Sequence, residues 1–378
     1  MKIVLSGVET NNKGAELMLY AILQEIESKF PDAIVYISEM SIRQGISYVK
    51  TNLDLRLLAI EKLINKIHLN GILYRLGLPK INCMSLVKAD YYLDASGFLF
   101  SDQTNLFGTK PEEWKHLLKK QKRHGAKIVF LPQAFGPFEL ESTKKTIGII
   151  SQYSNIIIAR EQVSFEYLKN TGLVDMRKVR KYPDFTSLVP GKFPSYYNHL
   201  KNGVCVIPNE RMIQKGMISL DGYITLLLKI INKAKNNGRC VYLLNHEGVG
   251  DEKLALMCKS KLNNMIDVVT GLDAFEVKGI ISSAYLVISS RFHGVASALN
   301  SCVPCLSTSW SHKYEQLFSD YDQKDCVLPL DNEEYCLNKV EEFLNEDIHE
   351  KIKAVLKKKL PYVQEETRKM WNEVWNCD

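Results

Sequence analysis

Short apolar runs alternate along the chain with longer segments whose apolar residues recur every three or four positions. The runs predict buried strands, and the longer segments predict helices with one apolar face. In the first half this pattern predicts strands at 2–6, 33–38, 91–94, 127–132 and 155–159, and helices at 14–30, 112–124 and 162–170. Strands that alternate with helices are typical of a parallel, doubly wound sheet.

The alternation breaks at 183–194, a stretch with three prolines and one glycine, and then resumes. The second half predicts strands at 203–208, 239–245, 268–269 and 285–289, and helices at 220–236, 251–262, 274–283 and 295–300. We therefore expect an α/β protein with two Rossmann-like doubly wound domains facing a cleft, at 1–190 and 200–345. Helices in 346–378 carry Met370, Trp371 and Trp375 and are expected to pack back across the junction.

Two basic helical segments have two interpretations each. Residues 57–76 combine apolar residues at helical spacing with several basic residues, which suits a core helix or an interfacial one. The helix at 112–124 carries a cluster of basic side chains, Lys115, Lys119, Lys120, Lys122 and Arg123. A solvated face is the simpler interpretation of this cluster, and peripheral contact with anionic lipid is the alternative.

Composition narrows the classes of function. The 378 residues include 46% hydrophobic and 24% charged residues and carry a formal net charge of +6, values of a mildly basic globular protein. Such a charge favours acidic substrates or an anionic membrane surface, and no interleaving of aromatic and basic residues indicates nucleic acid binding. The N-terminal residues predict a first strand and not a signal peptide, and no segment resembles a membrane span, so we expect a cytoplasmic protein.

The nine cysteines have no framework spacing, which suits a reducing compartment. Cys302 and Cys305 form the only C-x-x-C pair, but the pair follows a helix, and no second pair completes a zinc site. Buried thiols are the favoured interpretation. The sequence thus implies neither a metal nor a cofactor.

The segment 282–313 carries the clearest candidate chemistry. A strand with Leu286, Val287 and Ile288 at its centre leads through Arg291 and His293 into a helix of small residues. Both side chains would lie near the backbone N–H groups and the positive dipole end of that helix. Lys313 follows one strand later and is expected in the same pocket. Cations gathered in this way predict a site for a dianion.

Loops after other predicted strands hold further candidates. Asn12 and Glu16 follow the first strand, as ligand contacts or as a helix cap with an acid in the first turn. Asp94, Gly97 and Asp102 follow the strand 91–94, and they suit sugar hydroxyls, a base for a hydroxyl proton, or a simple turn.

Three more loops repeat this choice between a ligand and a structural role. Gln133 could orient a substrate or belong to a structural turn. Arg160 could fork onto an anion or pair with Glu161 or another acid. His246 and Asp251 follow the strand 239–245 and form a weaker pair near the same cleft.

Taken in order, these loops resemble the polysaccharide pyruvyl transferase family across nearly the whole chain. The matching pieces are Asn12-Lys13-Gly14-Ala15-Glu16, Ser96-Gly97 with Asp102, Gln133 with Gly136-Pro137, Arg160-Glu161 with Ser164, Pro183-Asp184, and Ser290-Arg291-Phe292-His293 with Lys313. The resemblance implies a fold like that of glycosyltransferase-B enzymes. It also implies transfer of an enolpyruvyl-derived group from phosphoenolpyruvate to a sugar, which forms a pyruvate ketal.

The resemblance implies roles for the candidate residues. Arg160, Arg291 and His293 match the positions that handle phosphoenolpyruvate, with Lys313 beside them. His293 is the candidate acid for the methylene carbon, and Asp94 or Asp102 is the candidate base for the sugar. The residues expected to contact the acceptor are Asn12, Glu16, Gly97, Gln133 and His246. The acceptor sugar, its linkage to lipid, the ketal linkage and the oligomeric state stay open.

Two other classes of function stay open. A glycosyltransferase of the same architecture would use a nucleotide sugar and would usually hold the ribose with an acid on a helix after the anion loop. Residues 294–311 contain no Asp or Glu, which disfavours this class, although Glu315 lies just beyond. A sugar-binding module without catalysis would need neither the cations nor the histidine.

Overall fold

The computed structural model describes residues 1–42, 44–58, 82–308 and 313–377, with single positions at 64, 69, 70 and 75. Most of the basic apolar segment 57–76 lies outside the described residues. The chain forms two compact units. Unit 1 comprises Met1–Thr10, Met18–Phe185 and Glu366–Asp378, and unit 2 comprises Asn11–Leu17 and Thr186–Glu365. The short segment Asn11–Leu17 thus belongs to unit 2, although it lies near the N-terminus.

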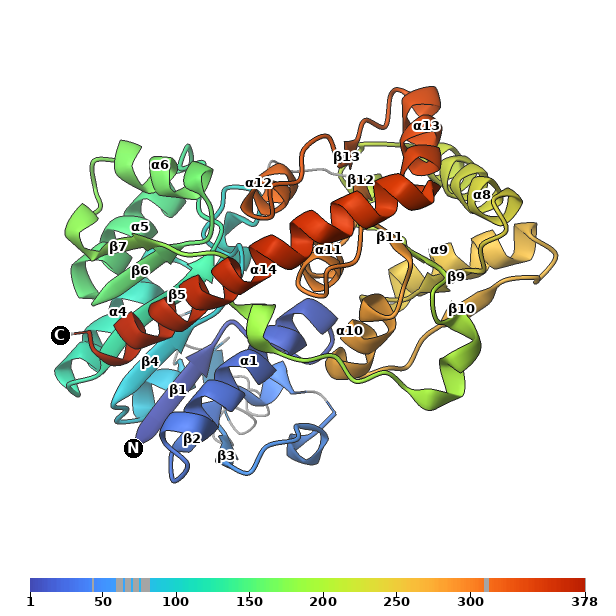
Figure 1. Ribbon diagram of the computed structural model, residues 1–378. Coiled ribbons are helices and arrows are strands. Elements are labelled where there is room, and N and C mark those ends of the chain that lie inside the picture. Colours follow the sequence, from blue (N-terminus) through green and yellow to red (C-terminus); the bar gives the residue numbers. More distant parts are fainter. Residues whose placement is uncertain are drawn as a thin grey trace. The chain divides into compact units, whose positions relative to one another are not determined.

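Unit 1 contains a seven-stranded parallel sheet in the order β3-β2-β1-β4-β5-β6-β7 (Figure 1). Its strands are β1 (Lys2–Ser6), β2 (Ile34–Ile37), β3 (Asp54–Leu57), β4 (Tyr91–Asp94), β5 (Lys127–Gln133), β6 (Ile156–Ala159) and β7 (Val179–Lys181). The interleaved helices are α1 (Lys13–Lys29), which begins in unit 2, α4 (Pro111–Arg123), α5 (Glu141–Tyr153) and α6 (Gln162–Asn170).

Unit 2 contains a six-stranded parallel sheet in the order β10-β9-β8-β11-β12-β13. Its strands are β8 (Val204–Ile207), β9 (Val241–Leu244), β10 (Asp267–Val269), β11 (Leu286–Ser289), β12 (Cys305–Thr308) and β13 (Val327–Leu328). Its helices are α7 (Arg211–Gln214), α8 (Leu220–Asn236), α9 (Gly248–Lys261), α10 (Ala274–Ser282), α11 (Phe292–Leu299), α12 (Lys313–Asp320), α13 (Glu333–Leu344) and the first part of α14 (Glu346–Trp375).

Short 3-10 helices complete the connections. They are η1 (Glu39–Ser41), η2 (Ile46–Tyr48), η3 (Cys83–Leu86), η4 (Asn105–Gly108), η5 (Met176–Lys178), η6 (Phe185–Leu188) and η7 (Ser195–Leu200). Within the described residues, no helix has both the length and the apolar character needed to cross a bilayer.

The strand orders confirm the predicted fold class. Counted within each unit, the first six strands of both sheets follow the order 3-2-1-4-5-6, which is that of a Rossmann fold. The strand order reverses between β1 and β4 in unit 1 and between β8 and β11 in unit 2. Ligands of such sheets bind beyond the carboxyl ends of the strands at this reversal. The loops after these four strands are therefore the expected positions of a ligand site.

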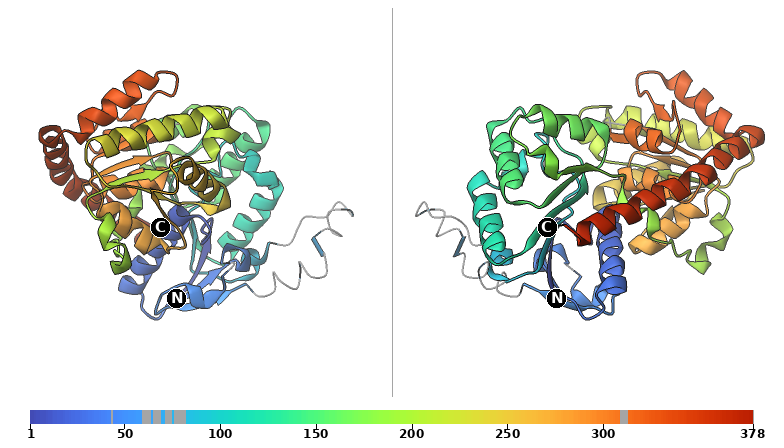
Figure 2. Two further views of the ribbon diagram at one scale, coloured as in Figure 1. Left: turned by 90° about the vertical axis from the view of Figure 1, so that its right-hand side faces the viewer. Right: turned by 60° about the vertical axis from the view of Figure 1, so that its left-hand side comes forward.

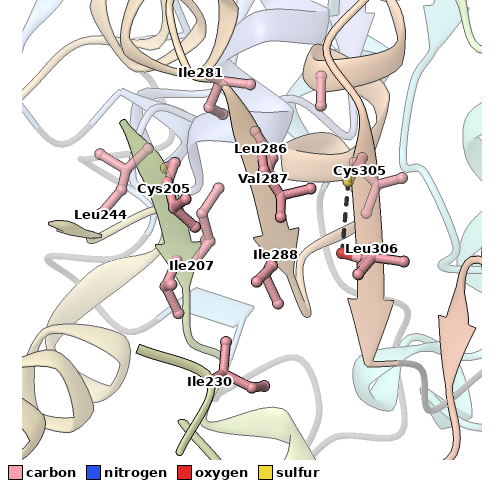
Figure 3. Close-up of a cluster of buried hydrophobic side chains, with 14 of the residues drawn as sticks. Cys205, Ile207, Ile230, Leu244, Ile281, Leu286, Val287, Ile288, Cys305 and Leu306 are labelled. Carbon is pink, nitrogen blue, oxygen red and sulfur yellow. Dashed lines mark hydrogen bonds between the residues drawn. The ribbon is translucent and has the colours of Figure 1, made fainter. Parts of the chain in front are cut away.

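The core of unit 2 explains why its strands appear in the sequence as continuous apolar runs. Val287 and Ile288 of β11 lie among Cys205 and Ile207 of β8 and Leu306 of β12, and each is at most 3% exposed (Figure 3). A parallel strand covered on both faces needs apolar residues at successive positions. Burial of each large aliphatic side chain contributes about 1.5–3 kcal/mol.

The C-x-x-C cysteines belong to this packed region. Cys302 and Cys305 are free thiols, and the Cys305 thiol donates to the Leu306 carbonyl over 3.6 Å (Figure 3). Burial raises the pKa of both thiols. A raised pKa keeps a thiol protonated and unreactive. The interpretation of buried thiols holds for Cys305, whereas Cys302 is partly buried.

The last turns of α14 are part of unit 1, where both ends of the chain lie (Figure 2). The Trp375 ring packs edge-on against Phe30 and Tyr91, with centroid distances of 5.3 and 5.2 Å. Its indole N–H donates to Glu25 over 2.9 Å, and Trp371 stacks on it at 5.7 Å. These contacts give the large apolar residues of the C-terminal helix their packing surface.

Candidate functional site

The start of α11 follows from local hydrogen bonding at the end of β11. The Ser289 hydroxyl accepts from the Arg291 N–H at 3.0 Å and donates to the Arg291 carbonyl at 3.1 Å, which turns the chain from strand to helix. Arg291 is the N-cap, with extended backbone (φ −108°, ψ 129°) and no capping bond from its side chain. Gly294 lets the helix approach the strand, because a Cβ there would lie 2.4 Å from the Ser289 hydroxyl.

A buried network of hydroxyl groups fixes the residue before Arg291. The Ser290 hydroxyl bonds to Tyr223 at 2.7 Å and to Thr308. Its carbonyl accepts from Asn209 at 2.6 Å and from the Tyr314 hydroxyl at 2.8 Å. These partners come from four other segments of unit 2, so the backbone immediately before Arg291 is held rigidly.

The Arg291 side chain is neutralised by acids of α9 and its preceding loop. Its Nε and Nη2 donate to the two oxygens of Asp251 at 2.7 and 2.6 Å, and Nη1 donates to Glu247. Burial disfavours the charge on Arg291, but the carboxylates outweigh burial and raise the pKa of the guanidinium. The sequence predicts a dianion site from the gathered charges of Arg291, His293 and Lys313, but acids on neighbouring elements neutralise the charge of Arg291.

The segment Asn11–Leu17 supplies the start of α1 to unit 2. The Asn12 side chain accepts from the backbone N–H groups of Gly14 and Ala15 at 2.8 and 3.3 Å, so Asn12 caps the helix. Glu16 is fully buried and accepts from the Lys13 ammonium at 2.6 Å. Both predicted acceptor contacts, Asn12 and Glu16, therefore have structural partners in unit 2.

The first turn of α1 lies directly against His293. A Cβ atom on Gly14 would lie 2.3 Å from His293 Nδ1 and 2.7 Å from its Cγ. The backbone of Asn12 also forms an isolated antiparallel bridge with Glu247. Unit 2 thus brings together the starts of α1, α9 and α11, three segments far apart in the sequence.

His246 lies in this same group, just before Glu247. The side chain is 3% exposed, and its Nδ1 is buried with no hydrogen-bond partner among the described residues. Burial lowers the pKa of His246 well below its usual value, and the charges of Arg291, His293 and Lys13 add to the effect. His246 is therefore a neutral imidazole at neutral pH.

Lys313 is the first residue of α12, and it is buried, with 7% of its surface exposed. Its ammonium lies 5.7 Å from the ring centroids of both Phe292 and Tyr314, within cation–π range. Phe292 is the first residue of α11. The structure thus places Lys313 beside the start of the helix that carries His293.

In unit 1, Asp94 ends β4 at the point where the strand order reverses. It is fully buried, and one oxygen accepts from the Ser96 N–H at 3.2 Å and from the Gln133 amide at 3.3 Å. The other oxygen is buried with no partner among the described residues. Burial raises the pKa of Asp94 against the lowering effect of its hydrogen bonds, and a raised pKa suits a base that works near neutral pH.

We predict that Asp94→Asn stabilises the protein at neutral pH. Since burial raises the pKa of Asp94 in the folded state, the unfolded state loses its proton first as pH rises, and stability falls from about pH 4 upward. The amide removes this loss. Thermal unfolding across pH should show a higher Tm for the variant at pH 7, with the difference shrinking toward pH 4. A constant difference across that range would contradict the assignment.

The other predicted candidates of unit 1 differ in their surroundings. Both Asp102 oxygens are engaged at the start of α5, one by the Glu139 N–H at 2.6 Å and the other by the Thr143 hydroxyl. Gly97 has a positive φ of 71°, and its carbonyl accepts from the Ala134 N–H at 2.9 Å. Gly97 therefore shapes the loop after Asp94, whereas Asp102 holds the start of α5.

Arg160 follows β6 and pairs with Asp184 at 3.7 Å, with both side chains 4% exposed. The neighbouring Glu161 caps α6 by accepting from the Ser164 N–H at 2.6 Å. Of the two roles predicted for Arg160, the structure shows the ion pair, and the acid is Asp184. Arg160 belongs to unit 1, whereas Arg291, His293 and Lys313 belong to unit 2.

Sequence reasoning missed the acids that hold Arg291 and the contact between Gly14 and His293. The sequence suggests Asp251 only as a partner of His246, and no signal in it identifies Glu247. Within the part of the chain that the structure describes, no cluster of three or more His, Cys, Asp or Glu side chains is arranged to hold a metal ion.

Two parallel α/β sheets with this strand order define a GT-B-like protein, and solved structures share the fold. MnaA of S. aureus, in a co-structure with UDP, has a TM-score of 0.61 and 12% identity over 99% of this chain and 96% of its own. The UDP-GlcNAc 2-epimerase of Neisseria meningitidis, bound to UDP-GlcNAc, has a TM-score of 0.60 and 11% identity over 99% of both chains. HepE of Anabaena, in complex with UDP-glucose, has a TM-score of 0.56 and 11% identity over 99% and 100%.

The family is given by a comparison with protein-family models. The family model described as polysaccharide pyruvyl transferase matches residues 12–312. The chain therefore belongs to the polysaccharide pyruvyl transferase family, and the resemblance found in the sequence is confirmed. No curated protein matches the chain.

Proposed function

We propose that this protein transfers the three-carbon group of phosphoenolpyruvate to two hydroxyls of a saccharide, forming a pyruvate ketal and releasing phosphate. The observation that carries the proposal is the site of unit 2, in a chain of this transferase family. There His293 lies in the first turn of α11, directly against the first turn of α1 and just after the cap residue Arg291. A proton donor beside helix N-termini suits an anionic donor substrate.

The reaction balances with the groups that the chain provides. Protonation of the methylene carbon makes it a methyl group and leaves a cationic C2, which the first sugar hydroxyl attacks with loss of its proton. The bond from C2 to the phosphate oxygen then breaks, and phosphate leaves with the electron pair. The second hydroxyl attacks C2 and loses its proton, which closes the ketal. His293 supplies the proton for the methylene carbon. A carboxylate accepts the proton of one sugar hydroxyl, and the deprotonated imidazole of His293 takes up the proton of the other.

The surroundings of the candidate residues suggest a division of roles. Arg291 and Lys313 border the start of α11 on the donor side, and Arg160 is proposed to hold an anionic group of the donor. Asp94 is the favoured base, because one of its oxygens has no partner among the described residues, whereas both oxygens of Asp102 are engaged. Gln133, which bonds to Asp94, is proposed to contact the acceptor.

We place the reaction in the cytoplasm, where free thiols such as Cys302 and Cys305 persist. A lipid-linked acceptor would bring the protein to the inner face of the membrane.

The test is incubation of the protein with phosphoenolpyruvate and a panel of saccharides that contain a galactoside diol. We expect release of inorganic phosphate that depends on the acceptor, together with a product whose mass has gained one pyruvate ketal. Phosphate release without an acceptor-derived product would contradict the proposal. Mass spectrometry of the products would also identify the acceptor and the linkage.

A second candidate function is that of a nucleotide-sugar enzyme, because the proteins that share the fold have structures with UDP or a UDP-sugar. A nucleotide-sugar enzyme needs an acid for the ribose, and Glu315 in the first turn of α12 is the candidate. The same assay with UDP-sugars separates the two functions, because release of UDP would favour the second. Binding of saccharides without turnover of either donor would leave a sugar-binding module.

A further inference from the structure

Three helix N-termini meet in unit 2. The caps of α1 and α9 are joined by the backbone bridge between Asn12 and Glu247, and the cap of α11, Arg291, donates to Glu247. Gly14 in the first turn of α1 lies against His293 in the first turn of α11. Each helix start carries a partial charge of roughly +0.5, so the backbone makes this place attractive to an anion.

The side-chain charges at this place largely cancel. Arg291 is matched by Asp251 and Glu247, and the Lys13 ammonium by Glu16. Three nitrogens of Arg291 already donate to carboxylates. Attraction for a dianion therefore comes chiefly from the helix starts. Its recognition needs donors beyond those of Arg291, and the Lys13 ammonium, which has three N–H groups, can bond to a ligand while it holds Glu16.

Two such donors adjoin the backbone bridge. Lys13 follows Asn12 and begins α1, His246 precedes Glu247, and the charge of Lys13 contributes to the lowered pKa of His246. His246 is buried, with an Nδ1 that has no partner among the described residues. A ligand that bonds to this nitrogen would remove the cost of an unsatisfied buried group.

We propose that Lys13 and His246 bind the phosphate of the donor where the starts of α1, α9 and α11 meet, and that Arg291 is a positioning residue that holds the loop of His246 through Glu247. This inference rests on the proposed function and assigns a new role to two residues. Lys13 was not a predicted site residue, and His246 was expected on the acceptor side. The neutral imidazole can donate one N–H to a phosphate oxygen.

The test measures binding of inorganic phosphate and of phosphoenolpyruvate by isothermal titration calorimetry. Lys13→Gln and His246→Gln should each raise Kd for both anions about tenfold, the order expected when a hydrogen bond to a charged group is lost. His246→Asn should retain more affinity than His246→Gln, because the Asn amide can occupy the place of Nδ1. Lys253→Gln on α9 and His199→Asn are the matched controls, since both residues are exposed in unit 2, and their Kd should stay unchanged.

Wild-type Kd values in folded Lys13→Gln would overturn the assignment of Lys13. Equal losses in His246→Asn and His246→Gln would overturn the role of Nδ1. If His246 variants fail to fold, Lys13→Gln still tests the site, because this side chain is partly exposed. Failure of this inference is distinguishable from failure of the function. Ketal formation with unaltered binding in the variants removes only the inference, whereas tight phosphate binding without ketal formation removes only the function.

Discussion

His293→Ala is expected to keep the fold and to lower kcat by about 10²- to 10⁴-fold, the range of a general acid. The imidazole lies against the backbone at Gly14 and makes an edge contact with the Phe292 ring, with the ring centroids 5.2 Å apart. Truncation leaves intact the two bonds between the Ser289 hydroxyl and the Arg291 backbone at the start of α11, which do not involve His293. The measurement is the initial rate of phosphate release from phosphoenolpyruvate with saturating acceptor, beside the thermal unfolding curve.

Two further variants separate proton transfer from packing. His293→Gln keeps a hydrogen-bonding side chain but supplies no proton at neutral pH, so it should be as inactive as the alanine variant. His199→Ala removes an exposed histidine of unit 2 and should leave kcat unchanged. Full turnover in His293→Ala or His293→Gln would remove His293 from the mechanism.

The fold was predictable where burial determines the sequence pattern. The strand at 285–289 was evident because β11 is covered on both faces, and helix 220–236 because Ile224, Leu227 and Ile231 recur on its buried face. The edge strands β3 and β7 were missed, since the first includes Asp54 and Arg56 and the second ends in a basic pair. A strand with one neighbour can carry charges, so the apolar run that marks a strand disappears.

Helix α5 was missed for a different reason. Its cap position is Leu140, which forms no side-chain capping bond, so the usual start signal is absent. The partner that holds its first turn is Asp102, whose oxygens accept from Glu139 and Thr143. A capping group so distant in the sequence leaves no local trace, and the sequence alone suggests Asp102 as a candidate base.

The site was predictable residue by residue but not in its connections. Arg291 and His293 were predictable as site residues because they stand between a predicted strand and a predicted helix. The acids that neutralise Arg291 lie 40 and 44 residues away on another element. Their effect on the charge of Arg291 depends on a contact formed only in the folded chain, so the local sequence does not indicate it. Likewise, nothing local indicates that Gly14 meets His293. Electrostatic conclusions drawn from residue types alone therefore overstated the free positive charge.

Gly14→Ala is expected to lower kcat about 100-fold while the protein stays folded, although it adds a single methyl group. The new Cβ would lie 2.3, 2.7 and 2.9 Å from Nδ1, Cγ and Cβ of His293, closer than atoms of a real side chain approach. Rotation of the ring cannot relieve the contact with Cβ, so α11 or α1 must shift. Misplacement of a catalytic group by about 1 Å commonly costs this factor. The check is kcat for phosphate release.

The stability of the same variant provides a second measure, because two opposing effects meet at this position. Alanine within a helix gains about 1 kcal/mol over glycine, whereas overpacking costs about 1–3 kcal/mol. Gly148→Ala in α5 is the matched control, since its nearest neighbour, Leu173 Cβ, would be 3.8 Å away, and it should gain stability with unchanged kcat. In Gly14→Ala/His293→Ala the two ring atoms are gone, so the double variant should be more stable than the sum of the single changes predicts. Strict additivity, or wild-type turnover in Gly14→Ala, would show that this contact does not hold the imidazole.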